Sequence, residues 1–381
     1  MNSEKLMRRL ELPDSADPAQ PVDYCLVTLA CKDGFSVSLC SLGASIRRIA
    51  YPLPSGGFKN IALSFDQDSA YLSNPLYAGA VLAPCAGRIS RGRLPLGPEG
   101  TVCTLSRNEN GRHTLHGGPH NASFQNWTLL SLSQTETSAR ASFGLTLRDG
   151  LDGFPGNRRL KAVYTLNEQH VLTLKLEAVS DRETYFNLSN HCYFHLSGDF
   201  SRPASEHLLQ IRADRYIRNA PDFIPEEEAD VTGTPFDFRR PRTLKEQSKN
   251  WPSDLQLAWN RGYNHAFILK RDPSSDSLRF SDEAADGASG PTQPLPPDLV
   301  CTLPQSPGRL CISSDAPCMV LYSGGYIQEG LALADGQFSH PGCALAFEFQ
   351  DYPDAPGGHG FPYRTTPAGA LWERTIRYSF Q

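Results

Sequence analysis

The sequence lacks the features that mark membrane, secreted and nucleic-acid-binding proteins. None of its apolar runs approaches the roughly 20 residues that a membrane-spanning helix needs. Residues 1–10 carry basic side chains without an apolar segment after them, so we expect no secretory signal. The formal net charge of −5 over 381 residues supplies no positive field for nucleic acid or anionic lipid. We therefore expect a cytoplasmic protein with no nucleic-acid partner and no membrane association.

The motifs of several enzyme classes are missing as well. The ten cysteines include no Cys-x-x-Cys pair, so we predict reduced thiols rather than a disulfide framework. The sequence has no glycine-rich phosphate loop, no dinucleotide-binding fingerprint and no G-x-S-x-G nucleophile elbow. These absences are consistent with chemistry that needs no redox step, phosphoryl transfer or covalent intermediate. We therefore expect no cofactor.

Turn-forming residues are plentiful instead. The 31 glycines and 30 prolines exceed their usual share and predict many turns and few long helices. Apolar and polar residues alternate in residues 139–147, 160–166, 172–178 and 372–380, which is the pattern of half-buried antiparallel strands. In the last of these, Arg374 is a charged exception on the apolar face. Further strands are expected at residues 24–29, 35–40, 45–51, 208–212, 265–269, 310–313, 319–322 and 344–349.

These patterns predict an all-β fold, a large antiparallel β-sandwich or barrel with few short helices. The two short helices are expected at residues 4–12 and Leu244–Asn250. Residues 271–298 are rich in Asp, Ser, Gly and Pro and lie between two predicted strands. We interpret them as a flexible surface insertion rather than a domain linker, because polar motifs lie on both sides of them. Residues 1–381 are thus expected to form a single domain.

Two histidine-containing clusters interrupt the strand pattern. Residues 116–118 (HGG) are typical of a loop whose backbone approaches another group closely; an ordinary turn with an incidental histidine is the alternative. Residues 185–196 contain His191 and His195, which would share one face of a strand. A zinc site there would lack the H-E-x-x-H pattern and a convincing third ligand. We therefore expect hydrogen-bonded histidines in a polar groove, and no metal.

A third cluster lies in residues 344–356. Glu348 and Gln350 share one face of a strand in which they alternate with Phe347 and Phe349. A carboxylate inside so apolar a strand is costly unless it is paired or functional. The alternative is an edge strand whose glutamate faces water.

Taken together, these clusters resemble the aldose 1-epimerase family, also called galactose mutarotases. Eight short motifs follow the family's order over about 320 residues, and this order is more specific than any single motif. Residues 271–298 have no counterpart in typical members. The motifs are residues 42–47 (LGASIR), 63–67 with 71–72 (LSFDQ, YL), 77–90 (YAGAVLAPCAGRIS), 115–118 (LHGG), 190–194 (NHCYF), 262–265 (GYNH), 321–324 (LYSG), and 348–350 with 353–356 and 361–362 (EFQ, PDAP, FP).

The resemblance implies a single-domain β-sandwich of the galactose mutarotase type, with a sugar-binding groove across one sheet. It also implies a reaction, the interconversion of the α and β anomers of a free aldose such as galactose or glucose. His191 would be the general acid that protonates the ring oxygen, and Glu348 the general base that takes the proton from the anomeric hydroxyl. His116 would be the second histidine of the catalytic site, which binds the sugar near the reacting centre.

The resemblance also assigns binding residues, and several of them depart from the family pattern. Arg88 and Tyr193 fall in stretches that contact the sugar. The family usually has asparagine at Gly87, aspartate at Asn264 and glutamine at Val320. Because the acid and the base are retained, these three changes predict an altered sugar preference rather than lost catalysis.

Alternatives to a free-sugar epimerase stay open at this point. One is a sugar-binding protein with little or no turnover, although binding alone does not require an acid–base pair. Another is an epimerase for a modified or phosphorylated hexose, with Arg91 and Arg93 as its phosphate clamp. A zinc hydrolase is a further alternative. The expected partner is a small-molecule sugar, on which Tyr322 could stack, and the chain is expected to be a monomer or a homodimer.

Overall fold

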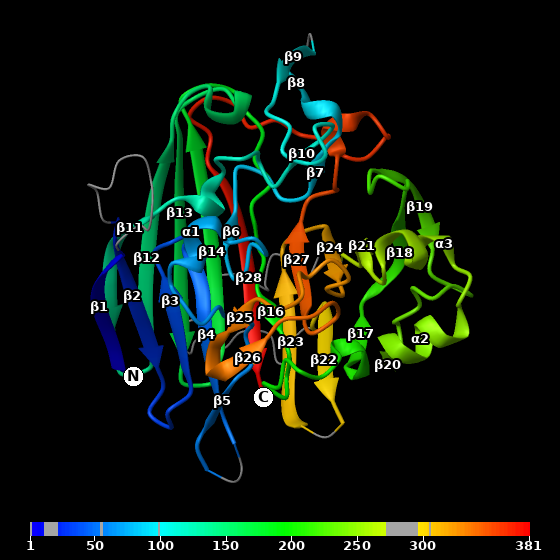
Figure 1. The fold of residues 1–381 in the computed structure, drawn as a ribbon. Helices are drawn as coiled ribbons and strands as arrows, with labels where there is room; N and C mark the ends of the chain where they lie inside the picture. The colour runs from blue at the N-terminus through cyan, green and yellow to red at the C-terminus, as the bar shows by residue number, and fades with distance from the viewer. Residues whose placement is uncertain (1, 11–21, 54–55, 98–99, 272–295, 305) are drawn as a thin grey trace.

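The computed structural model describes residues 2–10, 22–53, 56–97, 100–271, 296–304 and 306–381, and antiparallel strands dominate it (Figure 1). Sheets of nine, six and five strands make up most of the fold. Four two-stranded sheets lie in the connections between them. The predicted all-β sandwich class is confirmed.

The nine-stranded sheet forms one layer. The C-terminal strand lies at its centre, where it pairs with one strand on each side. The sheet order is β11 (Thr128–Gln134), β12 (Ser138–Leu147), β13 (Arg158–Asn167), β14 (Val171–Ser180), β28 (Trp372–Phe380), β23 (Ser306–Ser314), β22 (Leu299–Leu303), β17 (Leu208–Ile211) and β20 (Arg242–Thr243).

The other two large sheets face this layer. The five-stranded sheet is a meander of β1 (Asn2–Leu10), β2 (Val22–Ala30), β3 (Ser36–Cys40), β4 (Ser45–Pro52) and β5 (Phe58–Asn60). The six-stranded sheet has the order β16 (Tyr193–Phe194), β27 (Leu345–Gln350), β24 (Cys318–Tyr322), β21 (Asn264–Leu269), β18 (Ala213–Asn219) and β19 (Pro225–Asp230).

The two-stranded sheets pair β6 (Val81–Leu82) with β15 (Ser189–Asn190), β7 (Arg88–Ile89) with β10 (Thr114–Leu115), β8 (Arg93–Leu96) with β9 (Thr101–Thr104), and β25 (Ala332–Leu333) with β26 (Gln337–Phe338). The first two of these pairs hold functional candidates at their ends. Asn190 ends β15 directly before His191, and Leu115 ends β10 directly before His116.

One hydrophobic core joins the three large sheets. Val27 of the five-stranded sheet, Leu174 of the nine-stranded sheet and Phe347 of the six-stranded sheet belong to the same buried cluster. The rings of Phe194 and Tyr378 lie 5.9 Å apart and link β16 to β28. The alternation predicted for β14 is visible in its burial, since every second residue is buried and those between are half-buried. Apolar burial on this scale is the main favourable term that holds the sandwich together.

The helix predicted at residues 4–12 is wrong, because residues 2–10 form strand β1. This strand pairs along its length with β2, and Leu6 lies opposite Leu26. Leu6 and Met7 are both exposed, so the strand is held by backbone hydrogen bonds to its neighbour rather than by an apolar helical face. The end of the predicted helix lies outside the described residues. A helical spacing of apolar residues over one or two turns is too weak a signal to outweigh strand pairing.

The helix predicted at Leu244–Asn250 is confirmed as α2. It begins with a capping box in which the Thr243 side chain accepts from Glu246 N and the Glu246 side chain accepts from Thr243 N. Two further short helices, α1 (Ala70–Ser73) and α3 (Leu255–Asn260), were not predicted.

The insertion predicted at residues 271–298 lies almost wholly outside the described residues. Its two ends are described, and they meet: Arg271 Nη1 lies 3.3 Å from Oδ1 of Asp298, whose side chain is fully buried. The single-domain organisation stays a prediction. All ten cysteines lie in the described ranges and carry free thiols, as predicted. Among the helices of the described ranges, none has the length and apolar character required to cross a bilayer.

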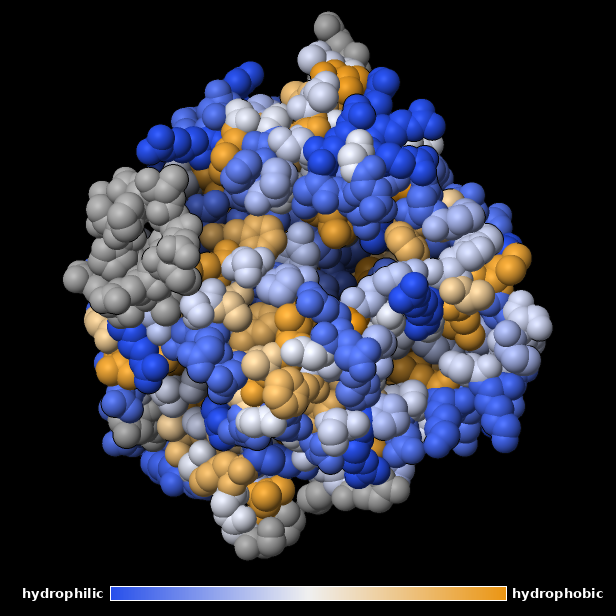
Figure 2. Space-filling model, in the orientation of Figure 1, coloured by the Kyte–Doolittle hydropathy of each residue, from blue (hydrophilic) through white to orange (hydrophobic). Residues whose placement is uncertain are grey.

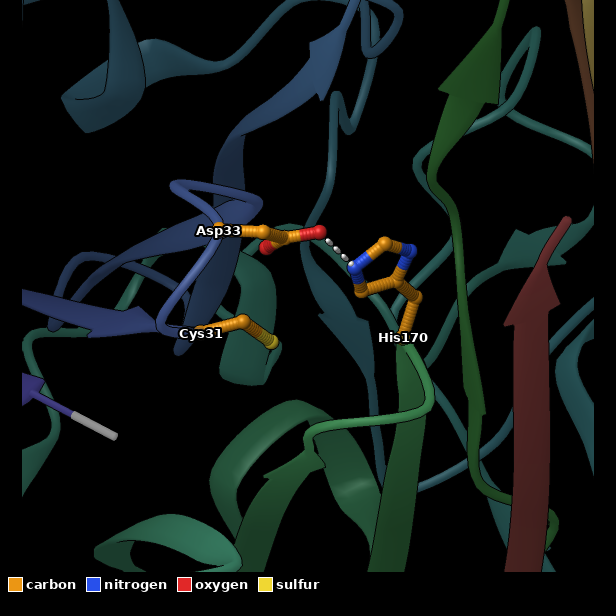
Figure 3. A group of neighbouring side chains, drawn as sticks. All are labelled: Cys31, Asp33 and His170. Atoms are coloured by element: carbon orange, nitrogen blue, oxygen red, sulfur yellow. Dashed lines mark hydrogen bonds and ion pairs between the residues drawn. The ribbon is translucent and has the colours of Figure 1, made fainter.

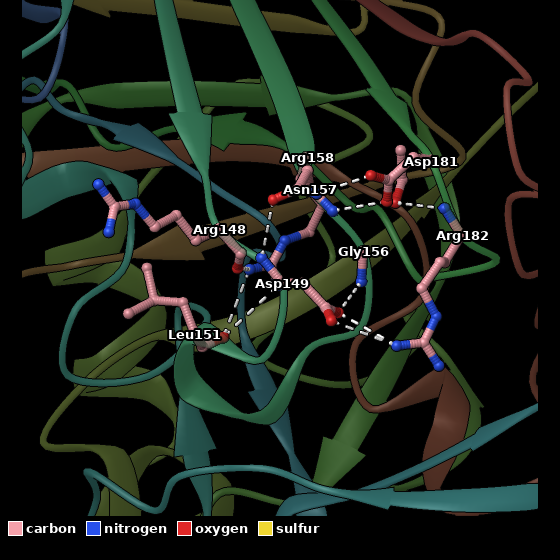
Figure 4. Close-up of polar contacts among 9 residues, drawn as sticks. Arg148, Asp149, Leu151, Gly156, Asn157, Arg158, Asp181 and Arg182 are labelled. Carbon is pink, nitrogen blue, oxygen red and sulfur yellow. Dashed lines mark hydrogen bonds and ion pairs between the residues drawn. The ribbon is translucent and has the colours of Figure 1, made fainter.

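A buried arginine organises the turn between β12 and β13 (Figure 4). The side chain of Arg158 is fully buried, and its Nη2 donates to the carbonyl oxygen of Arg148 at 2.6 Å. Its guanidinium also contacts the ring of Phe154 at 5.6 Å. Burial lowers the pKa of Arg158 to about 10, although Asp149 and Asp152 oppose this. The turn matters for the site below because Asp152 packs against Gly118.

We predict that Arg158→Met destabilises the protein. The methionine keeps much of the apolar stem but removes the hydrogen bonds that the buried guanidinium donates to Arg148 O and Leu151 O, which costs about 1–3 kcal/mol. Urea unfolding followed by tryptophan fluorescence measures the change. Arg159→Met is the matched control, because Arg159 is the exposed neighbour on the same strand and should shift stability by less than about 0.5 kcal/mol. Equal losses in the two variants would contradict the role given to Arg158.

Candidate active site

A cavity of about 460 Å³ lies over the face of the six-stranded sheet that points away from the core. Figure 2 shows a hollow near the middle of this side of the molecule, bordered by both hydrophilic and hydrophobic residues. The structure brings all nine sequence-predicted site residues to the cavity: Gly87, Arg88, His116, His191, Tyr193, Asn264, Val320, Tyr322 and Glu348.

Strand pairing places Glu348 in the floor of the cavity. Glu348 of β27 lies opposite Val320 of β24, and Val320 lies opposite Ala266 of β21, so its neighbours across the sheet are apolar. Phe347 and Phe349 enter the core on the other face. Because β27 lies between β16 and β24, the alternative of an edge strand with a water-facing glutamate is wrong. Glu348 is only 4% exposed.

Glu348 forms a close, buried pair with His191. Nε2 of His191 lies 3.5 Å from Oε1 of Glu348. Burial raises the pKa of Glu348 well above the ordinary carboxyl value, and the charge of Arg88 partly opposes this rise. Burial lowers the pKa of His191 below the ordinary histidine value. These opposite shifts favour a pair that holds a single proton at neutral pH, with that proton on the carboxyl group of Glu348.

The backbone of His191 is fixed by the segment that precedes β6. Nδ2 of Asn190 donates to Gly79 O at 2.8 Å, and His191 N donates to Ala80 O at 2.9 Å. Gly79 N donates back to His191 O at 3.0 Å. Gly79 has a φ of +69°, and a Cβ at this position would collide with Ile46 O, so the close approach requires glycine. The histidine is therefore held by backbone contacts before any ligand binds.

His116 is oriented by a reciprocal pair of hydrogen bonds with Gly87. His116 N donates to Gly87 O at 2.9 Å, and Gly87 N donates to His116 Nδ1 at 3.1 Å. Since Nδ1 accepts, the proton of the neutral ring lies on Nε2. Burial, and then the neighbouring His191 and Arg88, lower the pKa of His116 well below the ordinary value, so the ring is neutral. His116 therefore offers a hydrogen-bond donor rather than a proton acceptor.

The two glycines after His116 make close approaches, as predicted from the sequence. A Cβ on Gly117 would lie 2.6 Å from Pro84 Cδ, and a Cβ on Gly118 would lie 2.7 Å from the side chain of Asp152. Both glycines have positive φ angles. The interpretation of an ordinary turn with an incidental histidine is wrong, since His116 faces the cavity and its ring centroid lies 5.5 Å from that of His191.

Arg88 reaches the cavity with its charge already paired. Its Nε and Nη2 donate to the two carboxylate oxygens of Glu109 at 2.7 and 2.5 Å. Its guanidinium also lies 4.9 Å from the ring of Phe223. Among the described residues that line the cavity, Arg88 is the one lysine or arginine. Sequence reasoning missed Glu109, because it lies in a polar turn without a strand or motif signal.

Gln350 is a second cavity residue to which the sequence assigned no role. The sequence placed it on the face of Glu348, and the structure confirms this position. Its amide is buried, and neither Nε2 nor Oε1 has a hydrogen-bond partner among the described residues. A Cβ on Gly87 would lie 3.4 Å from this amide nitrogen. The unpaired amide of Gln350 is therefore available to a ligand. It borders the space that Gly87 leaves open, where the family usually has an asparagine side chain.

The two tyrosines among the binding candidates differ in burial. The ring of Tyr193 is buried, with its centroid 4.8 Å from that of His191. The hydroxyl of Tyr322 accepts from Tyr326 N at 2.9 Å, which holds the Tyr322 ring against the cavity wall. Asn264 lies opposite Tyr322 in the strand pairing.

His191 and His195 do not share a site, so the prediction of a common strand face is wrong. The chain leaves the extended pairing at residues 191–192, between β15 and β16, and this interrupts the period of two. The ring of His195 lies 4.6 Å from that of His207, and its Nδ1 contacts Ser197 Oγ at 2.7 Å. Burial lowers the pKa of His195, as expected for a hydrogen-bonded histidine inside the fold.

The catalytic candidates themselves could hold a metal ion. One ligand atom each from His116, His191 and Glu348 lie within 4.8 Å of one another. The sequence offered no third ligand near His191, and the structure supplies two from distant segments. Two histidines and a glutamate are a donor set that zinc accepts, so the expectation of no metal stays a prediction.

Arg91 and Arg93 do not reach this cavity. They line a separate cavity of about 490 Å³, together with Arg112, His113 and His359. Arg112 is already paired there with Asp222 at 3.2 Å. A phosphate clamp built from Arg91 and Arg93 would therefore lie outside the cavity that holds Glu348.

Comparison with known proteins agrees with this geometry. The family model described as aldose 1-epimerase matches residues 26–379. Aldose 1-epimerase of Escherichia coli (strain K12) is 27% identical over 354 residues, which is 92% of each chain. Human galactose mutarotase is 27% identical over 349 residues, covering 91% of this chain and 92% of that one. The solved structure of galactose 1-epimerase from Lactobacillus acidophilus has a TM-score of 0.78 and 26% identity, covering 100% of this chain and 99% of that one. The chain belongs to the aldose 1-epimerase family and is an isomerase.

Proposed function

We propose that this isomerase interconverts the α and β anomers of a free aldose in the cytoplasm, where its ten thiols stay reduced. The observation that carries the proposal is the buried pair of Glu348 and His191 in the floor of a sugar-sized cavity. A protein that only bound sugar would have no need to bury an acid and a base together.

The one-proton pair suits a reaction that moves two protons and returns them. The opening step starts once the pair's proton has moved from Glu348 to His191, whose Nε2 lies 3.5 Å from Oε1 of Glu348; His191 then donates this proton to the ring oxygen while Glu348 takes the proton of the anomeric hydroxyl. The bond between C1 and the ring oxygen breaks, and a free aldehyde forms. The pair still holds one proton, which now lies on Glu348. Rotation about the C1–C2 bond exposes the other face of the aldehyde, and closure reverses both transfers.

The other cavity residues position the sugar. The Nε2 proton of His116 can bind an oxygen near C1, and the guanidinium of Arg88 and the amide of Gln350 can bind ring hydroxyls. The apolar floor at Val320 and Ala266 suits the C–H face of a pyranose. Tyr193 and Tyr322 supply ring faces around it.

A free sugar fits this cavity better than a sugar phosphate. A bound phosphate dianion would need cations or several donors in the cavity. Arg88 is committed to Glu109, and Arg91 and Arg93 line a separate cavity. We therefore propose that the substrate is an unphosphorylated aldose, with galactose and glucose among the first candidates. Residues that line the cavity, such as Asn264, would bind its hydroxyls.

Removing the acid or the base should abolish most of the activity. We expect Glu348→Gln and His191→Asn each to lower kcat/KM by about 10²–10⁴-fold, the usual contribution of a positioned acid or base. Polarimetry of fresh α-D-glucose and α-D-galactose measures the approach to the equilibrium rotation. Circular dichroism establishes that the variants fold.

Two outcomes would contradict the proposal. Acceleration that survives in both folded variants would remove the roles given to Glu348 and His191. If folded wild-type protein accelerates neither sugar, pentoses, disaccharides and hexose phosphates are tested next. Turnover of hexose phosphates alone would favour the modified-sugar alternative, and binding without turnover would favour a sugar-binding protein.

The pH dependence should reflect the opposite pKa shifts of the pair. Activity needs one proton on the pair, so kcat/KM falls when a second proton binds and when the single proton leaves. Because burial lowers the pKa of His191, the acid limb lies below the ordinary histidine value; because burial raises that of Glu348, the alkaline limb lies far above the ordinary carboxyl value. We expect a flat profile through neutral pH. An acid limb at about 6.5, where an ordinary histidine titrates, would contradict the predicted shift.

Gln350 should contribute to binding rather than to proton transfer. We expect Gln350→Leu to raise KM about tenfold with little change in kcat, since one uncharged hydrogen bond to the sugar is lost. Initial rates by polarimetry over a range of sugar concentrations separate the two constants. Gln67→Leu, a change at an exposed glutamine outside the cavity, is the matched control. A fall in kcat alone would contradict a binding role.

A further inference from the structure

Three residues with metal-binding side chains, none of which lines the cavity, meet where two turns of the chain come together (Figure 3). Cys31 follows the end of β2, and Asp33 lies in the turn that leads to β3. His170 lies in the turn between β13 and β14. The cluster therefore joins the five-stranded sheet to the nine-stranded sheet, and the proposed reaction uses none of its members.

The ligand atoms of the three side chains converge. Nε2 of His170 lies 2.7 Å from Oδ2 of Asp33. These atoms and Sγ of Cys31 all lie within 4.8 Å of one another. Figure 3 shows the sulfur and the carboxylate directed toward the side on which the imidazole lies. Cys31 is buried, whereas the side chains of His170 and Asp33 are 21% and 51% exposed, so one side of the cluster is open to water.

Neighbouring groups hold each of the three side chains in place. Phe35 N donates to the second carboxylate oxygen of Asp33 at 3.0 Å, which leaves Oδ2 free to face His170. The ring of Phe35 stacks on that of His170, with centroids 4.5 Å apart and planes 20° from parallel. Sγ of Cys31 lies 3.2 Å from Asn167 O. Such outer contacts are what orient ligands around a bound metal.

We propose that Cys31, Asp33 and His170 bind a divalent cation of the zinc class, with water as the fourth ligand. A thiolate, an imidazole and a carboxylate form a mixed donor set that suits borderline-soft Zn²⁺ rather than Mg²⁺ or Ca²⁺. Tetrahedral bonds of about 2.0–2.3 Å require ligand atoms roughly 3.3–3.5 Å apart. The imidazole and carboxylate must therefore separate by about half an ångström from their present contact, a shift within reach of a partly exposed aspartate.

Binding exchanges protons for the metal. The Cys31 thiol loses its proton to solvent, and the Cys31–Asn167 contact gives way to a bond between sulfur and metal. Nε2 of His170 gives up the proton it shares with Asp33, to solvent from an imidazolium or to Nδ1 in a neutral ring, and two metal bonds replace the contact between Asp33 and His170. The carboxylate of Asp33 supplies negative charge for a cation at this point. A metal held here ties a turn of each sheet to the other, so its effect is on stability and not on turnover.

Cobalt binding tests the site directly. Protein freed of metal by a chelator is titrated with Co²⁺, and a thiolate ligand gives a charge-transfer band in the near ultraviolet. We expect one Co²⁺ bound with this band, displacement of Co²⁺ by Zn²⁺, and a higher melting temperature for the zinc-loaded protein. We expect the chelator-treated protein to keep its mutarotation rate.

Matched variants distinguish this cluster from other metal sites. Cys31→Ser should remove the charge-transfer band and weaken zinc binding at least tenfold, with unchanged mutarotation. Cys103→Ser changes a half-buried cysteine outside the cluster and should leave the band intact. Glu348→Gln removes a ligand from the catalytic cluster and should also leave it intact. If Cys31→Ser fails to fold, His170→Gln should weaken zinc binding by a similar factor.

Three outcomes would overturn the proposal. The first is no Co²⁺ or Zn²⁺ binding by calorimetry, which would leave an ordinary ion pair between Asp33 and His170. The second is a charge-transfer band that survives in folded Cys31→Ser or disappears in Cys103→Ser. The third is binding that only Glu348→Gln abolishes, which would place the metal in the active site.

Discussion

The site depends on the burial of one carboxyl group in an apolar sheet. Glu348 has Val320 as its cross-strand neighbour and phenylalanines before and after it in the strand, and no lysine or arginine of the described residues is bonded to it. In water its carboxyl group would be a weak base, and His191 would be a separate acid. Burial raises the pKa of Glu348 and lowers that of His191 until their order is reversed, so the carboxylate becomes the stronger base of the pair. A carboxylate of raised basicity beside a histidine that readily gives up its proton suits the proposed opening and closure of a sugar ring.

The strands and the core around β27 hold the carboxyl group of Glu348 in a position with little exposure to solvent. β27 is flanked on both sides, and its other face enters the core that all three large sheets share. At the end of the strand, Asp351 is bound by Arg374 of the central strand β28 at 2.6 Å, and its backbone amide donates to Asn187 Oδ1. Arg374, the charged exception in the apolar pattern of residues 372–380, is thus a buried residue that binds the end of the strand carrying Glu348. The free-energy cost of burying its guanidinium is offset because the charge is paired with Asp351.

The residues of the candidate site could be predicted where a short stretch of sequence contains an unusual side chain in its own context. A glutamate in an apolar strand and a histidine before two glycines are visible without a structure, and their motif order indicated a shared groove. Glu109 and the unpaired amide of Gln350 were not assigned roles, since one depends on a turn meeting Arg88 and the other on the missing side chain of Gly87. Arg91 and Arg93 lie outside the cavity of Glu348 because of how the loops pack, and the packing of loops cannot be predicted from the types of these two residues.

The sequence by itself determined the strand class and the family, because alternation and motif order are properties of the chain. Only the tertiary structure decided the features that depend on contacts between segments distant in the sequence. It made residues 2–10 a strand by supplying β2 as a partner, and it brought His116 to His191. It also joined Cys31 and Asp33 to His170. Burial and electrostatic coupling arise between groups close in space, so the shifted proton affinities of Glu348 and His191 exist only in the folded protein.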